Sequence, residues 1–228
     1  MASPNWHIFD GLTGYEAAQQ IMREHQQQLI ASEGGTEQIM LLSHPPLYTA
    51  GTSARPEDLL ARQKAELSEI EIFENTGRGG QWTYHGPGQR IVWPVLDLNR
   101  RTPDIRLYVH HLEGWIMDTL ASFGIDTERR ETLPGIWVRR HDIRQPDQLD
   151  KIAAIGVRVS KWVTMHGVAV NLDPDLSHYD GIIACGVTDG GVTSAAELGH
   201  LIPQAEFDMA LKACFEAHFG DGAQMGIR

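Results

Sequence analysis

The sequence predicts an α+β fold, a mixed β-sheet with helices packed on it, because three long amphipathic segments alternate with short apolar runs. The expected helices lie near residues 13–31, 104–123 and 203–219. The expected strands, rich in β-branched residues, cover about 38–43, 71–75, 90–98, 135–139, 152–159 and 163–172. This order contains no internal repeat and no linker, so we expect residues 1–228 to form a single domain.

The helical segments carry start and stop signals as well as an apolar face. Thr13 and Glu16 have the spacing of a capping box, and Pro203 suits the first turn of the last helix. Gly124 and Gly220 follow the second and third helices. The residues expected to face the core are Ala18, Met22 and Leu29, then Tyr108, Leu112, Trp115, Ile116 and Leu120, and finally Phe207, Leu211, Phe215 and Phe219.

Prolines mark where the strands end or become irregular. His44-Pro45-Pro46 terminates the 38–43 strand, and residues 47–51 then lead into a charged, loosely helical stretch that runs through residue 68. Pro94 lies inside the 90–98 strand and cannot donate a backbone hydrogen bond. This proline favours an edge strand or a bulge over the centre of a sheet.

Composition and charge limit the class of protein. The net charge of −11 argues against nonspecific nucleic-acid binding, and no run approaches the ~18 apolar residues of a membrane span. Two cysteines are too few for a disulfide framework, and the first residues lack the basic start and apolar run of a signal peptide. We therefore expect a soluble, cytoplasmic protein that binds neither nucleic acid nor membrane.

The charges are unevenly distributed along the chain. Residues 77–161 hold 13 Lys or Arg against 10 Asp or Glu, a balance of +3, while the remaining 143 residues hold 6 against 20, a balance of −14. Two interpretations stay open. The charges are either scattered and solvated, or they form a basic segment that steers an acidic macromolecule toward the site.

Cys185 and Lys151 are the candidate catalytic pair. Cys185 follows an apolar run and precedes a glycine, whereas Cys214 falls on the apolar face of the last helix and is expected to be structural. A nucleophilic thiol needs a base or a lowered pKa, and a partly buried Lys151 can stabilise the thiolate and carry its proton. His85 and His166 each precede a glycine, and each fits a base or a structural histidine.

The glycine-rich span 76–89 is a candidate ligand-binding wall. Its five glycines and one proline permit the close approach of a ligand to the backbone. The span lacks the GxxxxGK[ST] pattern of a phosphate loop, and no dinucleotide fingerprint opens a helix here. It instead suits an acyl or heteroaromatic tail. No histidine or cysteine spacing matches a metal site, so we expect no metal.

Five blocks of the sequence resemble, in the same order, those of the lipoyl (octanoyl) transferase family. They are HPPLYTAG at 44–51, RGGQWTYHGPGQ at 78–89, KIAAIGVRV at 151–159, WVTMHGVAVN at 162–171 and CG at 185–186. The similarity covers roughly residues 10–215, and several of the motifs are long.

This resemblance implies a fold shared with the catalytic domains of biotin and lipoate protein ligases. It also implies transfer of octanoyl from acyl carrier protein to a specific lysine of lipoyl domains, in 2-oxoacid dehydrogenase complexes and in the glycine cleavage H protein. No cofactor is expected, because exchange between thioesters is nearly balanced and the thioester-to-amide step runs downhill.

The resemblance also implies roles for individual residues. Cys185 would hold the octanoyl group as a thioester, and Lys151 would lower the pKa of the thiol and relay its protons. The substrate-binding positions of the family match Arg78, Gly79, Gly80, Gln81, Trp82, Thr83, Tyr84 and His85, then Ala154, Ile155 and Gly156, and finally Gly167, Val168 and Ala169.

The sequence departs from the family pattern at Ala184, where the family usually has a proline before the catalytic cysteine. An alanine loosens the backbone there and leaves the thiol in place. Two other hypotheses stay open, an ATP-dependent lipoate or biotin protein ligase and a non-catalytic acyl-binding module. Pyrophosphate release identifies the ligase, and an acyl adduct on Cys185 excludes the binding module.

Overall fold

The computed structural model describes residues 3–31, 35–131, 133–140, 148–183 and 190–220. The large sheet is built from β1 (Asn5–Leu12), β2 (Gln38–Ser43), β6 (Gln89–Val95), β7 (Ile136–Arg139), β8 (Leu149–Ser160) and β9 (Val163–Asn171). The small sheet is built from β3 (Leu47–Ala50), β4 (Glu71–Phe73) and β5 (Trp82–His85). The long helices of the described residues are α1 (Tyr15–Ala31), α2 (Ile105–Ala121) and α3 (Gln204–Phe219).

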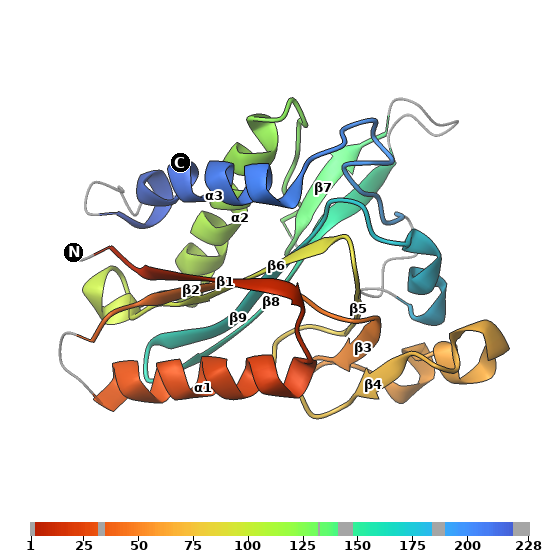
Figure 1. The fold of residues 1–228 in the computed structure, drawn as a ribbon, viewed down its shortest axis with the longest axis horizontal. Coiled ribbons are helices and arrows are strands. Elements are labelled where there is room, and N and C mark those ends of the chain that lie inside the picture. Colours follow the sequence, from red (N-terminus) through yellow and green to blue (C-terminus); the bar gives the residue numbers. More distant parts are fainter. Residues whose placement is uncertain (1–2, 32–34, 132, 141–147, 184–189, 221–228) are drawn as a thin grey trace.

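Both sheets are mixed. The large sheet has the strand order β1-β2-β6-β9-β8-β7, in which β1 runs parallel to β2 and the other neighbours are antiparallel. The small sheet has the order β4-β3-β5, with β3 parallel to β4 and antiparallel to β5. Helix α1 covers one face of the large sheet, and α2 and α3 cover the other (Figure 1). The predicted architecture of a mixed sheet with packed helices is confirmed.

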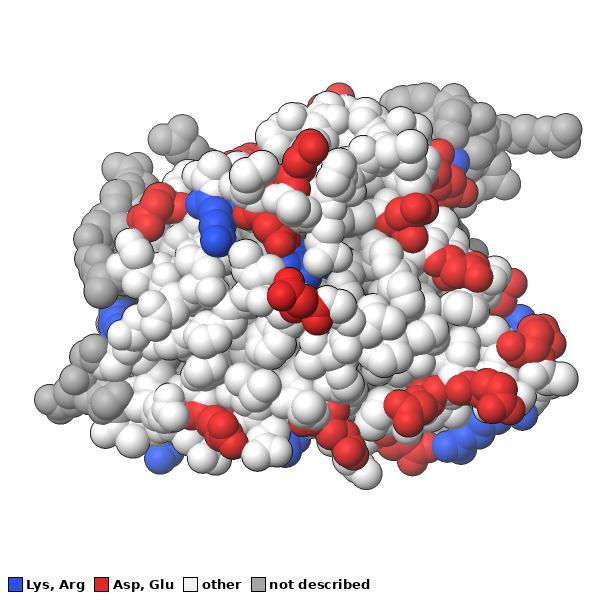
Figure 2. All heavy atoms as spheres, in the orientation of Figure 1, with Lys and Arg blue, Asp and Glu red and all other residues white. Residues whose placement is uncertain are grey.

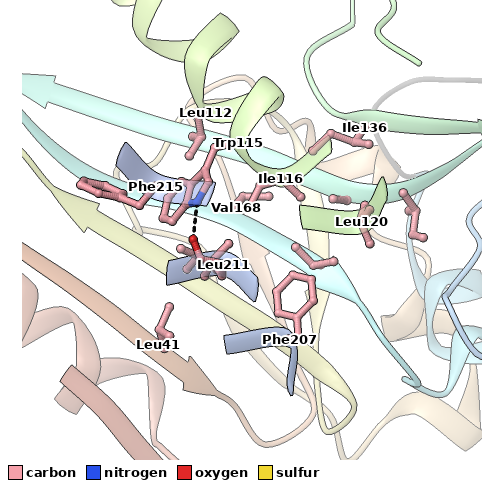
Figure 3. Packing of buried hydrophobic residues seen from close by; sticks show 14 of the residues in the cluster. Leu41, Leu112, Trp115, Ile116, Leu120, Ile136, Val168, Phe207, Leu211 and Phe215 are labelled. Carbon is pink, nitrogen blue, oxygen red and sulfur yellow. Dashed lines mark hydrogen bonds between the residues drawn. The ribbon is translucent and has the colours of Figure 1, made fainter. Parts of the chain in front are cut away.

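The core lies on both faces of the large sheet, as the helical periodicity predicts. Every residue that we expected on the inner faces of the three helices is buried. Between α2 and α3, the indole Nε1 of Trp115 donates to the carbonyl of Leu211 at 2.8 Å, so the large aromatic ring is buried without an unpaired donor (Figure 3). A second apolar cluster forms between α1 and the sheet, around Met22, Met40 and Trp93.

A buried ion pair connects α3 to the middle of the sheet. Arg90 on β6 is fully buried, and its Nε and one terminal nitrogen donate to the two carboxylate oxygens of Asp208 at 2.8 and 2.5 Å. Removing one member of such a pair leaves an uncompensated buried charge, which is strongly destabilising.

The proline favoured an edge strand or a bulge over the centre of the sheet, and this prediction was wrong. β6 lies between β2 and β9, yet its pairing with β9 stops at Val92, two residues before Pro94. Beyond that point Oγ1 of Thr164 donates to the carbonyl of Pro94 at 2.7 Å and accepts from the amide of Leu96 at 2.9 Å. A threonine hydroxyl therefore replaces the ladder bonds that the proline interrupts.

Three strands were not predicted. β1 lies at the edge of the sheet and is mostly exposed, so it has no apolar alternation to reveal it. β3 and β5 have four residues each, and they lie at the start of the 47–68 stretch and within the glycine-rich span, where we expected no strand. Three short 3-10 helices between Pro56 and Leu67 match the loosely helical stretch. None of the helices in the described ranges is long and apolar enough to cross a bilayer.

Candidate active site

A cavity of about 320 Å³ lies where the glycine-rich span crosses the strands β8 and β9. All of the predicted substrate-binding residues except Tyr84 line this cavity, and so does Lys151. Its other lining residues are Tyr15, Ser53, Ile91, Trp93, Val109, Leu133, Pro134, Val157 and His166. The cavity therefore brings together three of the sequence blocks that are far apart along the chain.

Main-chain contacts hold the glycine-rich span against the large sheet. The amide of Gly79 donates to the carbonyl of Val157 at 3.1 Å. A Cβ on Gly79 would lie 2.8 Å from that carbonyl oxygen, and a Cβ on Gly156 would lie 2.9 Å from the carbonyl oxygen of Gly79. Both distances are shorter than a carbon–oxygen contact allows, so these glycines are required for the two backbones to meet.

Arg78 supports the cavity wall through its side chain. The guanidinium is buried and donates to Oγ1 and the carbonyl of Thr49 at 2.9 and 2.5 Å. It also donates to the carbonyls of Gly79 and Gln81 at 2.9 and 2.7 Å. Four of its hydrogen bonds thus shape the span that lines the cavity, in addition to any contact with a ligand.

Tyr84 points away from the cavity, because β5 alternates its side chains between two faces. Thr83 and His85 line the cavity, whereas Tyr84 packs against Tyr48 and Tyr179 on the other side of the small sheet. Its hydroxyl lies 2.7 Å from Nδ1 of His178. Burial raises the pKa of the Tyr84 phenol, so this side chain stays neutral.

Two buried histidines in the cavity wall are held neutral. Burial, together with the positive charges of Arg78 and Arg23, lowers the pKa of His166 from 6.5 to about 3. Burial, with His44 and Arg78 nearby, holds the pKa of His85 well below its usual range. Both histidines are poor proton acceptors near neutral pH, because a general base works best when its pKa lies near the operating pH.

Lys151 is buried and lines the same cavity. Its Nζ lies 4.5 Å from the centroid of the Trp137 ring, which is a cation–π distance, and donates to the carbonyl of Pro134 at 3.5 Å. Gly135 has a φ of +137°, and a Cβ there would lie 3.1 Å from Cε of Lys151. The glycine at 135 therefore leaves room for the lysine side chain.

Lys151 also borders a second cavity of about 320 Å³. This second cavity is lined by Trp137, Lys151, Leu176, Tyr179, Asp180, Ile182, Ile183, Gly190, Gly191 and Val192. Ile183 and Gly190 are the described residues nearest to Cys185 in the sequence on either side. Cys185 itself, like Ala184, lies outside the described residues, so its distance from Lys151 stays a prediction.

The chain on the C-terminal side of Cys185 is tied to Lys151 through the backbone. The amide of Lys151 donates to the carbonyl of Gly191 at 2.9 Å, and the amide of Thr193 donates to the carbonyl of Lys151 at 3.0 Å. The carboxylate of Asp150 accepts from the amide of Gly191 at 2.7 Å. Cys214, in contrast, is half-buried on α3 and packs against the core of the large sheet, as expected for a structural cysteine.

Several arginines between residues 77 and 161 form ion pairs within the protein. Arg139 makes two bonds of 2.8 Å to Glu128, and Arg140 lies 3.0 Å from Asp150 and 3.2 Å from Glu197. Four further arginines of this segment pair with carboxylates, namely Arg90, Arg100, Arg101 and Arg129. Among the charged side chains on the face shown in Figure 2, acidic ones predominate. The sequence tally therefore overstates the positive charge that is free to steer a partner, and steering stays a prediction.

Sequence reasoning missed several residues of the cavity. Ile91 and Trp93 are two positions apart on β6, and both face the α1 side of the sheet. Because side chains on one face of a strand recur every second residue, the sequence of that strand could have placed them together. Tyr15, at the start of α1, gave no such signal. Among the described residues, no group of three or more His, Cys, Asp or Glu side chains is arranged to hold a metal ion.

Comparisons with known proteins show the family to which the chain is similar. The model of the family "lipoyl protein ligase A/B catalytic domain" matches residues 15–216. An octanoyltransferase of Brucella melitensis is 49% identical over 219 residues, covering 94% of this chain and 80% of the relative. An octanoyltransferase of Parvibaculum lavamentivorans is 48% identical over 222 residues, covering 97% and 95%.

Solved structures show the same fold at low sequence identity. A lipoate-protein ligase A bound with ATP has a TM-score of 0.72 and 14% identity, covering 95% of this chain and 85% of the other. A bi-partite lipoate protein ligase of Thermoplasma acidophilum has a TM-score of 0.70 and 13% identity, covering 96% and 84%. The chain belongs to the lipoyl protein ligase A/B catalytic-domain family and is an acyltransferase of the octanoyltransferase group within it.

Proposed function

We propose that this enzyme takes an octanoyl group from acyl carrier protein and passes it to a specific lysine of a lipoyl domain through a thioester on Cys185. The observation that supports this most is the cavity whose lining unites the glycine-rich span, β8 and β9 and includes Lys151. Its walls are mostly apolar side chains and glycine backbone, which suit an unbranched acyl chain. The thioester end of such a chain would lie toward Lys151.

The first half-reaction forms the acyl-enzyme. The Cys185 thiolate attacks the carbonyl carbon of the octanoyl thioester, the new carbon–sulfur bond forms, and the bond to the carrier's sulfur breaks. The departing thiolate takes up a proton. In the second half-reaction the neutral amine of the acceptor lysine attacks the Cys185 thioester, the amide forms, and the Cys185 thiolate is released while the amine loses a proton.

Lys151 is the residue that we assign to these proton transfers. An ammonium group near the thiol favours the thiolate, because opposite charges stabilise each other most in a poorly solvated site. Its Nζ is held over Trp137 in a buried site at the border of both cavities. The low pKa values of His85 and His166 make them weaker candidates for the same role.

We infer the protein partners from the family of the enzyme and not from a docking surface in the structure. The acceptors would be lipoyl domains of 2-oxoacid dehydrogenase complexes and the glycine cleavage H protein. The second cavity, which borders Lys151, is the candidate entrance for the arm that carries the thioester and for the acceptor lysine. We place the reaction in the cytoplasm, consistent with a nucleophilic cysteine that must stay reduced.

Intact-protein mass spectrometry tests the proposal directly. The enzyme is incubated with octanoyl carrier protein without ATP, isolated, and then mixed with an unmodified lipoyl domain. We expect one octanoyl group on the enzyme, located on Cys185 by peptide mapping, and its transfer to the lipoyl domain in the second step. Cys214→Ser should behave as wild type, whereas Cys185→Ala should acquire no octanoyl.

Three outcomes would contradict the proposal. An octanoyl adduct that persists in Cys185→Ala would assign the nucleophile elsewhere. Transfer that needs ATP and releases pyrophosphate with free lipoate would identify a ligase. Tight acyl binding without any covalent adduct on wild-type enzyme would identify a binding module.

A further inference from the structure

Asn171 connects segments on both sides of the one that holds Cys185. It is the last residue of β9 and is 2% exposed. Its Oδ1 accepts from Nε2 of Gln89 at 2.9 Å and from the hydroxyl of Tyr179 at 3.3 Å, and its Nδ2 donates to the carbonyl of Thr193 at 2.9 Å. Of the uncharged side chains of this length, an amide offers both an acceptor and a donor, and here both are used.

The two ends of this connection lie before and after Cys185 in the chain. Tyr179 belongs to the 3-10 helix Leu176–Gly181, which precedes Cys185. Nε2 of Gln89 also donates to the hydroxyl of Tyr179, at 2.9 Å, so this helix is bound to the sheet from two sides. Thr193 follows Cys185 and is held by Asn171 through its carbonyl.

The same threonine is also held by the backbone of Lys151. Its amide donates to the carbonyl of Lys151 at 3.0 Å, while its carbonyl accepts from Asn171 at 2.9 Å. The chain around Thr193 is thereby fixed between the end of β9 and the residue of β8 that carries the candidate catalytic amine. Asn171 does not line either cavity, so it has no direct contact with the proposed ligand space.

We propose that Asn171 is a positioning residue: it holds Tyr179 and Thr193, which lie before and after Cys185 in the chain, against the end of β9, and the reactivity of the Cys185 thiol depends on this connection. This proposal rests on the proposed roles of Cys185 and Lys151. A buried amide that served only the stability of β9 would not need to join one segment before the cysteine to another after it. Thr193, which accepts from Asn171, also bonds to the backbone of Lys151, so a change at Asn171 should affect the reaction as well as the stability of the protein.

The variants for the test are Asn171→Leu, which has a similar shape without hydrogen bonds, and Asn171→Ala, which avoids a steric clash if the leucine variant fails to fold. Thr164→Val is the matched control. Thr164 lies on the same strand, is fully buried, and makes two side-chain hydrogen bonds, to Pro94 and Leu96. Thermal unfolding of all four proteins measures the loss of stability that each change brings.

The decisive measurement is the pH dependence of Cys185 alkylation by iodoacetamide, with peptide mass spectrometry separating Cys185 from Cys214. We expect the midpoint for Cys185 to rise by at least about one pH unit in the Asn171 variants, toward the ordinary thiol value of about 8.5. In steady-state transfer, kcat should fall at least ~10-fold while KM for octanoyl carrier protein changes less than ~2-fold, because the change acts on the reacting atoms. Thr164→Val should leave the midpoint and kcat near wild type.

Two outcomes would overturn the inference. One is a wild-type midpoint in folded Asn171→Leu or Asn171→Ala, and the other is an equal shift in Thr164→Val, which would show a general effect of lost stability. Failure of the proposed function is recognised separately, because wild-type enzyme would then form no acyl adduct on Cys185.

Discussion

His166 should make the stability of the protein sensitive to mild acid. The residue is buried in the cavity wall and has a φ of +57°, in the left-handed region where asparagine is tolerated better than most other residues. His166→Asn therefore removes a titrating group with little strain from the backbone. All other titrating groups are the same in the two proteins, so their contributions cancel in the comparison.

The direction and size follow from the lowered pKa of His166. Burial lowers this pKa from 6.5 to about 3, so between these pH values the unfolded chain binds a proton that the folded protein does not. The stabilisation is present in full above pH 6.5 and is lost as the pH falls toward 3. A pH of 5 lies about 1.5 units below the pKa of the histidine in the unfolded chain, which corresponds to a loss of roughly 2 kcal/mol of unfolding free energy relative to pH 8.

Urea unfolding at pH 8, 7, 6 and 5 measures this loss. The free energy of unfolding should fall between pH 8 and pH 5 by roughly 2 kcal/mol more in wild type than in His166→Asn. The difference in unfolding free energy between the two proteins at pH 8 gives the cost of the substitution itself, and it is subtracted from the differences at lower pH. Equal pH dependence in the two proteins would show that His166 is charged in the folded state or solvated, and would refute the reasoning.

Two further substitutions test the supports of the site and of the fold. Gly135→Ala should slow Cys185 acylation and cost about 1–3 kcal/mol of unfolding free energy, because a residue with a Cβ is strained at a φ of +137° and this Cβ presses on the side chain of Lys151. Acylation kinetics measure the first effect and urea unfolding the second. An acylation rate equal to that of wild type would contradict the importance of this contact. Asp208→Ala should cost about 3–5 kcal/mol in urea unfolding because it leaves Arg90 charged and fully buried, whereas Glu74→Gln, which breaks the exposed pair with Arg62, should cost less than about 1 kcal/mol. Similar losses for Asp208→Ala and Glu74→Gln would contradict the assigned role of burial.

Most of the fold could be predicted because its long elements carry strong periodic signals. The helix containing Trp115 and the β8–β9 pair were predicted to within a few residues, since apolar spacing, caps and β-branched runs agree there. β1 could not be predicted, because an exposed edge strand has no buried face to leave a pattern. Pro94 misled the prediction because Thr164, 70 residues away, supplies the hydrogen bonds that a proline in a central strand lacks.

The candidate site could be predicted only in part. The family resemblance selected the residues that line the cavity, but the side-chain directions depend on tertiary structure. Tyr84 lies in the middle of a matching block and still points to the other side of β5. The charge tally overstated the free positive charge for a related reason, because carboxylates from outside residues 77–161 pair with arginines inside this segment, as Glu37 does with Arg101 and Glu197 with Arg140.

The close contact between Gly79 and Gly156 limits how this enzyme could be redesigned. Where two backbones meet without side chains, the width of the cavity is set by the sheet and by the hydrogen bond between Gly79 and Val157, not by rotamers. Trimming side chains cannot widen that part, since glycine has no side chain to remove, and adding a side chain would push the two backbones apart. Selection for longer or branched chains should therefore accumulate changes at Ile155, Val168 and Trp93, where the wall consists of side chains.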